Sequence, residues 1–167
     1  MIEGHLVLVG LMGTGKTTVG QRLGEILGRP FYDSDEMIEA RTGRTVREIF
    51  ADDGEAAFRA IETEVLRDAL AATEPAVIAG AGGVVLQPAN REALRELAGR
   101  VVWLRADPSV LVERVKSGGH RPLLDGDPAG TLARMHHDRE PLYREVADLV
   151  IDVDDLDVGR VIAAVLA

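Results

Sequence analysis

The chain has 167 residues, 46% of them hydrophobic, which suits one globular domain with a sizeable core. Its 19 basic and 28 acidic residues give a formal net charge of −9, which argues against a surface built to bind nucleic acid backbones. The sequence has no cysteine, no apolar run long enough to span a membrane and no secretory signal pattern, so it predicts a cytoplasmic protein without disulfides or thiol chemistry.

Short apolar runs alternate with helical patterns along the whole chain. The runs predict buried strands at residues 6–9, 31–32, 76–79, 101–104 and 149–151. Helical spacing follows at 16–27, from about residue 34, and at 54–72. This alternation predicts a single α/β domain over residues 1–167, with three layers and a parallel sheet that binds ligands at the carboxyl ends of its strands.

Residues 10–17 read Gly-Leu-Met-Gly-Thr-Gly-Lys-Thr and match the phosphate-binding motif G-x-x-x-x-G-K-[ST], between a predicted strand and a predicted helix. The glycines let backbone N–H groups converge on phosphate oxygens. Lys16 would reach the β and γ phosphates, and the Thr17 hydroxyl would ligate Mg²⁺. The motif therefore predicts ATP or GTP binding, and an ordinary glycine-rich turn is the alternative. A GTPase is disfavoured because the single asparagine, Asn90, begins no guanine-binding Asn-Lys-x-Asp motif.

An acidic pair is the best candidate for metal and proton chemistry. The strand at 76–79 ends without the aspartate that motor-type ATPases place there. Asp33 and Asp35 instead follow the strand at 31–32, on the ligand-binding edge of the sheet. One carboxylate could hold Mg²⁺ through water while the other accepts a proton from a hydroxyl acceptor. In the alternative interpretation Asp33 only caps a helix, with Glu36 as its partner.

Several arginines could bind anionic substrates. Arg59 and Glu62 are i, i+3 neighbours, and the sequence leaves open whether they form a surface pair or an arginine fork aimed at a carboxylate. Residues 80–83 are glycine-rich and could let backbone amides approach a ligand. Arg121 lies in a predicted mobile loop and could close on a phosphoryl group, and Arg139, after the next helical segment, is a further candidate. A solvated loop arginine is the alternative for Arg121.

These features, in this order, resemble shikimate kinases, which are small P-loop kinases of the nucleoside monophosphate kinase type. The resemblance covers residues 6–151. It rests on the P-loop at 10–17, Asp-Ser-Asp at 33–35, Gly-Glu-Ala-Ala-Phe-Arg at 54–59 with Glu62, the glycines near 82, Arg-Pro-Leu-Leu at 121–124 and Arg-Glu-Pro-Leu-Tyr at 139–143.

The resemblance implies a P-loop NTPase fold: a three-layer α/β/α sandwich with a five-stranded parallel sheet in the order 2-3-1-4-5. It also implies a substrate-binding segment at about 33–62 and a lid at about 117–128. The implied reaction moves the γ-phosphoryl group of ATP to the 3-hydroxyl of shikimate, with Mg²⁺, in aromatic amino acid biosynthesis. Shikimate and ATP would be the partners of a monomer.

The resemblance also implies roles for individual residues. ATP would bind at Gly13, Thr14, Gly15, Lys16, Thr17, Thr18, Arg114 and Arg121. Shikimate would bind at Asp35, Arg59, Gly82, Gly83 and Arg139. Catalysis would rest on Asp35, Lys16 and Arg121, and Thr17 and Asp33 would serve Mg²⁺.

The chain departs from the family pattern at Ala81, where a glycine is usual, so a backbone contact there could be altered. Residues 152–157 lack the asparagine-proline turn that often flanks adenine, and their acids are expected to cap the last helix. Two alternative functions remain at this point. One is a related kinase for gluconate or a nucleoside monophosphate, and the other is a non-catalytic nucleotide-binding module.

Overall fold

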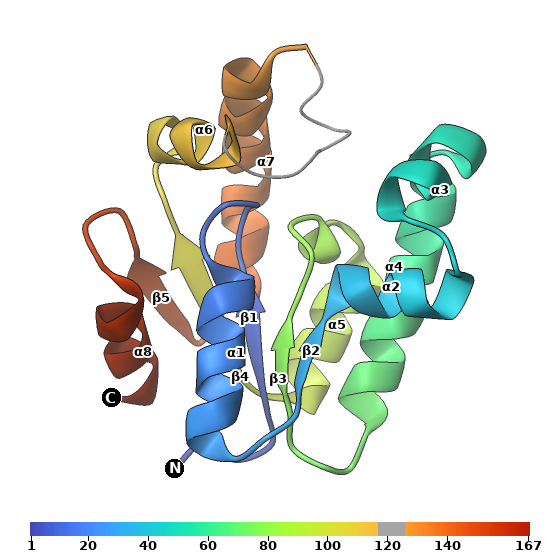
Figure 1. Cartoon of the computed structure of the whole chain (residues 1–167). Helices are drawn as coiled ribbons and strands as arrows, with labels where there is room; N and C mark the ends of the chain where they lie inside the picture. Colours follow the sequence, from blue (N-terminus) through green and yellow to red (C-terminus); the bar gives the residue numbers. More distant parts are fainter. Residues whose placement is uncertain (117–125) are drawn as a thin grey trace.

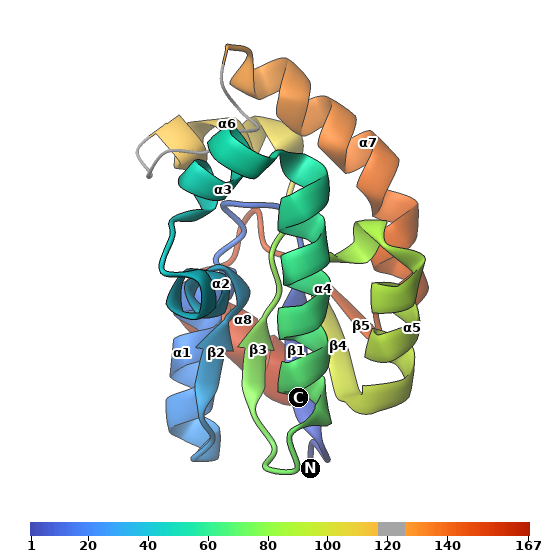
Figure 2. The ribbon, with the colours of Figure 1, turned by 90° about the vertical axis from the view of Figure 1, so that its right-hand side faces the viewer.

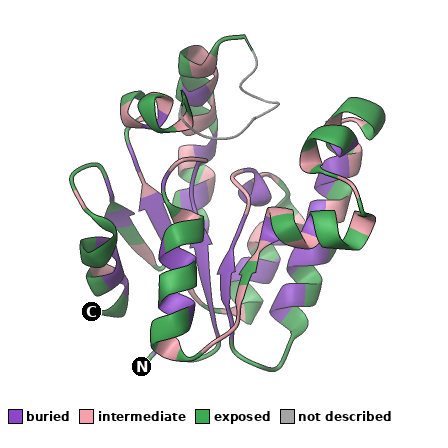
Figure 3. Ribbon diagram, viewed as in Figure 1, coloured by how far each residue is buried: buried purple, intermediate pink, exposed green. Residues whose placement is uncertain are grey.

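Five parallel strands form one sheet in the order β2-β3-β1-β4-β5 (Figure 1). The strands of this computed structural model, which describes residues 1–116 and 126–167, are β1 (His5–Val9), β2 (Phe31–Asp33), β3 (Val77–Ala79), β4 (Ala98–Arg105) and β5 (Leu149–Asp152). The five predicted strands and their implied order are therefore confirmed. Every residue of the central strand β1 is buried, as a strand covered on both faces requires (Figure 3).

Helices cover both faces of the sheet (Figures 1 and 2). Two lie on one face, α1 (Lys16–Leu27) and α8 (Val158–Leu166). Three lie on the other, α4 (Glu55–Ala71), α5 (Pro88–Leu97) and α7 (Pro128–Val146). The remaining helices are α2 (Ser34–Thr42) and α3 (Val46–Asp53), which pack on α4, and α6 (Pro108–Lys116), which packs on α7; a 3₁₀ turn, η1, spans Val84–Leu86. No helix within these described ranges is both long and apolar enough to cross a bilayer.

A second, smaller core holds α2, α3 and α4 together beside the main one. Ile38, Ile49, Phe58 and Val65 bury their side chains against one another there. Phe50 packs on Phe58 with the ring centroids 4.7 Å apart. This cluster fixes the predicted substrate-binding segment as a unit on the edge of the sheet, so its helices can present side chains to a pocket.

The structure corrects the expected place of Arg139. This residue lies inside α7 and not after a helical segment, because α7 continues through Pro141 to Val146. A proline removes one N–H from the helical ladder, but the buried Leu132, Tyr143 and Val146 anchor the helix on both sides of it. Arg139 is consequently carried on a packed helix and is itself buried.

Two aspartates cap helices, Asp157 as expected and Asp33 as its alternative interpretation proposed. Asp33 caps α2, since its Oδ1 accepts hydrogen bonds from the N–H groups of Asp35 and Glu36 at 3.0 and 3.2 Å. Asp157 caps α8 and accepts from the N–H of Arg160 at 2.8 Å. Of the predicted loop at 117–128, residues 117–125, with Arg121, lie outside the described residues, and α7 begins at Pro128.

Candidate active site

The loop between β1 and α1 forms a cradle that only glycines permit. Gly10, Gly13 and Gly15 have φ values of 143°, 86° and 93°. A Cβ at Gly10 would stand 2.4 Å from the Leu104 carbonyl oxygen, so no side chain fits there. Among the described residues no side chain caps α1, which leaves its first N–H groups available to an anion.

Two side chains of the P-loop motif form hydrogen bonds with carbonyl groups of the loop itself. Lys16 Nζ donates to the carbonyl oxygens of Gly10 at 2.6 Å and Leu11 at 2.9 Å, so the ammonium group lies over the loop. Thr14 is buried, and its hydroxyl donates to the Leu11 carbonyl at 2.9 Å. Its side chain therefore serves the loop conformation, and its backbone is the part that a phosphate can meet.

Thr17 and Asp33 meet as the metal hypothesis requires. Thr17 Oγ1 donates to Asp33 Oδ2 at 2.8 Å, while the other oxygen of Asp33 caps α2. Capping and metal binding are therefore compatible functions of one carboxylate. A hydroxyl and a carboxylate are hard oxygen donors that suit Mg²⁺, which commonly takes its other ligands from water and phosphate. The described residues contain no cluster of three or more His, Asp or Glu side chains that could replace those ligands.

The cradle opens into a large polar pocket. Arg114 reaches it from α6 and donates from Nη1 to the Gly13 carbonyl at 3.1 Å. The pocket gathers the predicted phosphate and metal residues Gly13, Gly15, Lys16, Thr17, Thr18, Asp33 and Arg114, together with Asp35.

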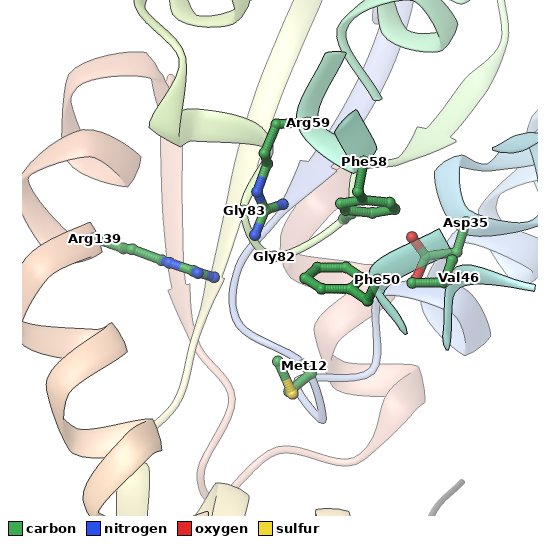
Figure 4. Close-up of a pocket in the computed structure, with 10 residues that line it drawn as sticks. Met12, Asp35, Val46, Phe50, Phe58, Arg59, Gly82, Gly83 and Arg139 are labelled. Carbon is green, nitrogen blue, oxygen red and sulfur yellow. The ribbon is translucent and has the colours of Figure 1, made fainter. Parts of the chain in front are cut away.

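A second pocket shares part of its lining with the first. Arg59 from α4 and Arg139 from α7 extend into it, and Asp35 lies on another wall (Figure 4). The rest of its lining is largely apolar or backbone: Met12, Val46, Phe50, Phe58, Ala81, Gly82 and Gly83. Met12, Asp35, Ala81 and Gly82 line both pockets. Asp35 thus stands where the phosphate cradle and the second pocket meet.

The Arg59–Glu62 pair is buried, which excludes the surface-pair interpretation. Arg59 Nη1 donates to Glu62 Oε1 and Oε2 at 3.1 and 3.2 Å, and Nη2 donates to Glu55 Oε1 at 3.5 Å. Glu62 is 0% exposed, and burial raises its carboxyl pKa, a shift that the positive charge of Arg59 opposes. The carboxylate therefore fixes the direction of the guanidinium that faces the pocket.

Arg139 makes the pocket attractive to an anion. Arg139 is 5% exposed, and among the described residues no carboxylate lies within ion-pair distance of its guanidinium. A buried cation without a carboxylate partner is costly unless a ligand supplies the charge. Together with Arg59 it forms a site suited to a small carboxylate.

The glycine turn at 80–83 brings backbone close to both arginines. A Cβ at Gly83 would stand 2.2 Å from Arg59 Nη1, so glycine is needed for the guanidinium to take its place. At Gly82 a Cβ would be 3.5 Å from Arg139 Nη1, an ordinary contact. Ala81 costs no backbone strain, because no described non-glycine residue has a positive φ.

The sequence did not lead us to the apolar wall of the second pocket, formed by Val46 and Phe50, or to Tyr143, which contacts the glycine turn. Val46 and Phe50 belong to α3, a helix that was not predicted separately although their i, i+4 spacing was a usable signal. Tyr143 is buried and donates its hydroxyl to the Gly82 carbonyl. No spacing rule connects residues 61 positions apart, so this contact required the fold.

Burial raises the pKa of the Tyr143 phenol to about 12, while the positive charge of Arg139 opposes the shift. The unfolded chain loses this proton near the ordinary value of 10.0, so stability falls as the pH rises from 10 towards 12. We expect wild type to lose about 1.4 kcal/mol more than Tyr143→Phe between pH 8 and pH 11. Urea unfolding of both proteins at the two pH values measures this difference, and parallel losses would contradict the buried, protonated phenol.

Comparison with known proteins gives a consistent result. The model of the family described as shikimate kinase matches residues 12–167. A shikimate kinase of Symbiobacterium thermophilum is 48% identical over 165 residues, covering 97% of this chain and 94% of that protein. The structure of a shikimate kinase from Acinetobacter baumannii in complex with shikimate superposes with a TM-score of 0.93 at 39% identity, covering 98% of this chain and 90% of that one.

A gluconokinase from Sinorhizobium meliloti is more distant. Its structure covers 99% of this chain and 90% of its own, with a TM-score of 0.60 at 22% identity. This similarity extends to the fold alone, which several phosphotransferases share.

Proposed function

The chain belongs to the shikimate kinase family and phosphorylates shikimate with ATP; we propose that the transfer takes place beside Asp35, on the wall that the two pockets share. The observation that carries this proposal is the juxtaposition itself. A glycine cradle for phosphates lies on one side of Asp35, and a small pocket with two buried guanidinium groups lies on the other. A donor and a carboxylate-bearing acceptor would meet there.

On the donor side, the backbone of the P-loop and the start of α1 would hold the phosphates of ATP. The contributing residues would be Gly13, Thr14, Gly15, Lys16, Thr17 and Thr18, with Arg114 beside the nucleotide. Thr17 and Asp33 would hold Mg²⁺, whose contribution when bound is to offset phosphate charge. Lys16 would exchange its hydrogen bonds to loop carbonyls for phosphate oxygens and stabilise charge during transfer.

On the acceptor side, Arg59 and Arg139 would grip the shikimate carboxylate. Gly82 and Gly83 would offer backbone N–H groups to the substrate. Asp35 would hydrogen-bond a hydroxyl of the substrate and accept its proton as the oxygen attacks the γ-phosphorus. The monomeric state stays a prediction from the sequence. The cytoplasmic location stays a prediction from the sequence.

The proposal also includes Arg121 and the lid at 117–128, which are predictions from the sequence. Residues 117–125 lie outside the described residues, so the role of Arg121 over the phosphates stays a prediction. Closure of this segment would exclude water, the competing acceptor.

Gly83→Ala should weaken acceptor binding without disturbing the nucleotide side. The added methyl would occupy the place of Arg59 Nη1, and Glu62 restricts where that guanidinium can move. We expect the KM for shikimate to rise by about 10-fold or more, since hydrogen bonds to charged groups are worth about 1.5–3 kcal/mol. Steady-state kinetics with each substrate varied in turn measures the change.

Gly159→Ala is the matched control, because Gly159 lies on α8 and a Cβ there would meet, among the described residues, only the Asp157 carboxylate at 3.4 Å, an ordinary contact. It should leave both KM values unchanged. A Gly83→Ala protein with wild-type KM for shikimate would show that Arg59 does not need its observed place.

The function is tested by coupled ADP release from MgATP with shikimate, gluconate, nucleoside monophosphates or no acceptor. Saturable release with shikimate alone is expected. Release that depends on gluconate or a nucleotide would reassign the acceptor, and release independent of any acceptor would remove the kinase assignment.

A further inference from the structure

The carbonyl groups of residues 81–86, in the turn before η1 and in η1 itself, all accept hydrogen bonds from protein donors. The N–H groups of Val84 and Leu86 bond to the carbonyls of Ala81 and Gly83 at 3.0 and 3.1 Å. Three side chains take the remaining carbonyls: Tyr143 that of Gly82, Asn90 that of Val84 at 3.0 Å, and Arg91 those of Val85 and Leu86 at 2.8 and 3.3 Å.

The backbone N–H groups of Gly82 and Gly83 differ from these carbonyl groups. Within the described residues no acceptor takes the N–H of Gly82 or of Gly83, and both glycines line the second pocket. A peptide plane that is held by its carbonyl presents its N–H in a fixed direction, because the two groups point oppositely across one rigid unit. The turn is therefore held through its carbonyl groups, and the N–H groups of Gly82 and Gly83 remain available as donors beside the second pocket.

Tyr143 bonds to the Gly82 carbonyl, and packing fixes the position of Tyr143 itself. It is 1% exposed, and its ring stacks on Trp103 with the centroids 5.5 Å apart. It lies on α7, four residues after Arg139, so both side chains belong to one face of that helix. One helix thus carries a guanidinium for the acceptor and the phenol that orients the neighbouring turn.

We propose that Tyr143 is a positioning residue for the acceptor: by holding the Gly82 carbonyl, it fixes the peptide unit that carries the Gly83 N–H and aims that amide at the bound substrate. The Gly82 N–H shares its peptide unit with the Ala81 carbonyl, which the Val84 N–H holds, and Arg91 supports the carbonyls farther along. The proposal rests on the proposed function, because it concerns the same pocket. Tyr143 is not among the described residues that line the second pocket, so it would act through the geometry of the turn.

Tyr143→Phe tests this directly, since it removes one hydroxyl and keeps the stacked ring. We expect the KM for shikimate to rise by about 5- to 20-fold, the usual effect of one hydrogen bond, while the KM for ATP stays within about twofold of wild type. Thermal unfolding shows whether the variant is folded. Tyr32→Phe is the matched control, because Tyr32 is the only other tyrosine and is exposed on β2; it should change neither KM.

If Tyr143→Phe does not fold, Arg91→Gln replaces it, since Arg91 holds two carbonyls of the same segment. It should raise the KM for shikimate by about threefold, as partial loss of one hydrogen bond would. Wild-type values in the folded test variant, or equal rises for both substrates, would overturn the positioning role. Absence of shikimate-dependent ADP release in the wild type would instead reject the proposed function.

Discussion

Replacing Lys16 with alanine is expected to lower kcat by about 1000-fold or more while leaving the fold intact, in line with the loss of a charge-stabilising donor in a preorganised site. In the structure Lys16 Nζ lies over the loop on the carbonyls of Gly10 and Leu11, at the mouth of the phosphate pocket. No other ammonium group can take over, because the chain has only one further lysine, Lys116. Single-turnover ADP release measures the transfer step.

Lys116→Ala is the natural control. Lys116 is an exposed residue of α6 that pairs with Glu113 at 3.1 Å, a contact that contributes little to stability. It should show wild-type turnover and wild-type thermal unfolding. A Lys16→Ala protein that retains more than about a tenth of the wild-type kcat would contradict the role assigned to the ammonium group.

Asp35→Asn is expected to reduce kcat by about 100- to 10,000-fold, the range that general-base catalysis supplies. Asparagine keeps the size of the side chain and a hydrogen-bonding oxygen but cannot accept the hydroxyl proton. Asp35 lines both pockets, where the proposed donor and acceptor would meet. Substrate binding should be less affected than turnover, so the loss should appear mainly in kcat.

Asp68→Asn makes the same chemical change at a position outside both pockets. Asp68 is exposed on α4 and pairs with Arg41 at 2.6 Å, away from both pockets. Its kinetic constants should equal those of wild type. Equal kinetics for Asp35→Asn and Asp68→Asn would exclude Asp35 as the proton acceptor.

The fold could be predicted because its signals are local. Buried parallel strands are short continuous apolar runs, and the P-loop marks the first strand-to-helix junction, so the α/β class followed from the alternation of five such runs with helical patterns. The strand order came from the resemblance to a family, since apolar runs carry no information about which strands are neighbours. Short helices such as α3 and α6 were not separated, because eight or nine residues carry little periodicity beyond a pair such as Val46 and Phe50, a signal that was overlooked.

The site was predictable where chemistry depends on a motif and not where it depends on tertiary contacts. Lys16, Thr17 and the acidic pair stand next to strand ends, so their convergence followed from the topology of parallel sheets. Whether Arg59 lay at the surface or in a pocket was undecided, because i, i+3 spacing is the same in both cases. Burial of Glu62 at 0% exposure settles that question, and only packing could supply it.

The most direct test of the central claim compares shikimate with its methyl ester as acceptor, using MgATP and the wild-type protein. The ester keeps the ring and its hydroxyls but removes the charge that Arg59 and Arg139 would bind. Saturable ADP release with shikimate, and a kcat/KM about 100-fold or more lower with the ester, is the predicted result. Equal kcat/KM values for the two acceptors, or no release with shikimate, would contradict the account.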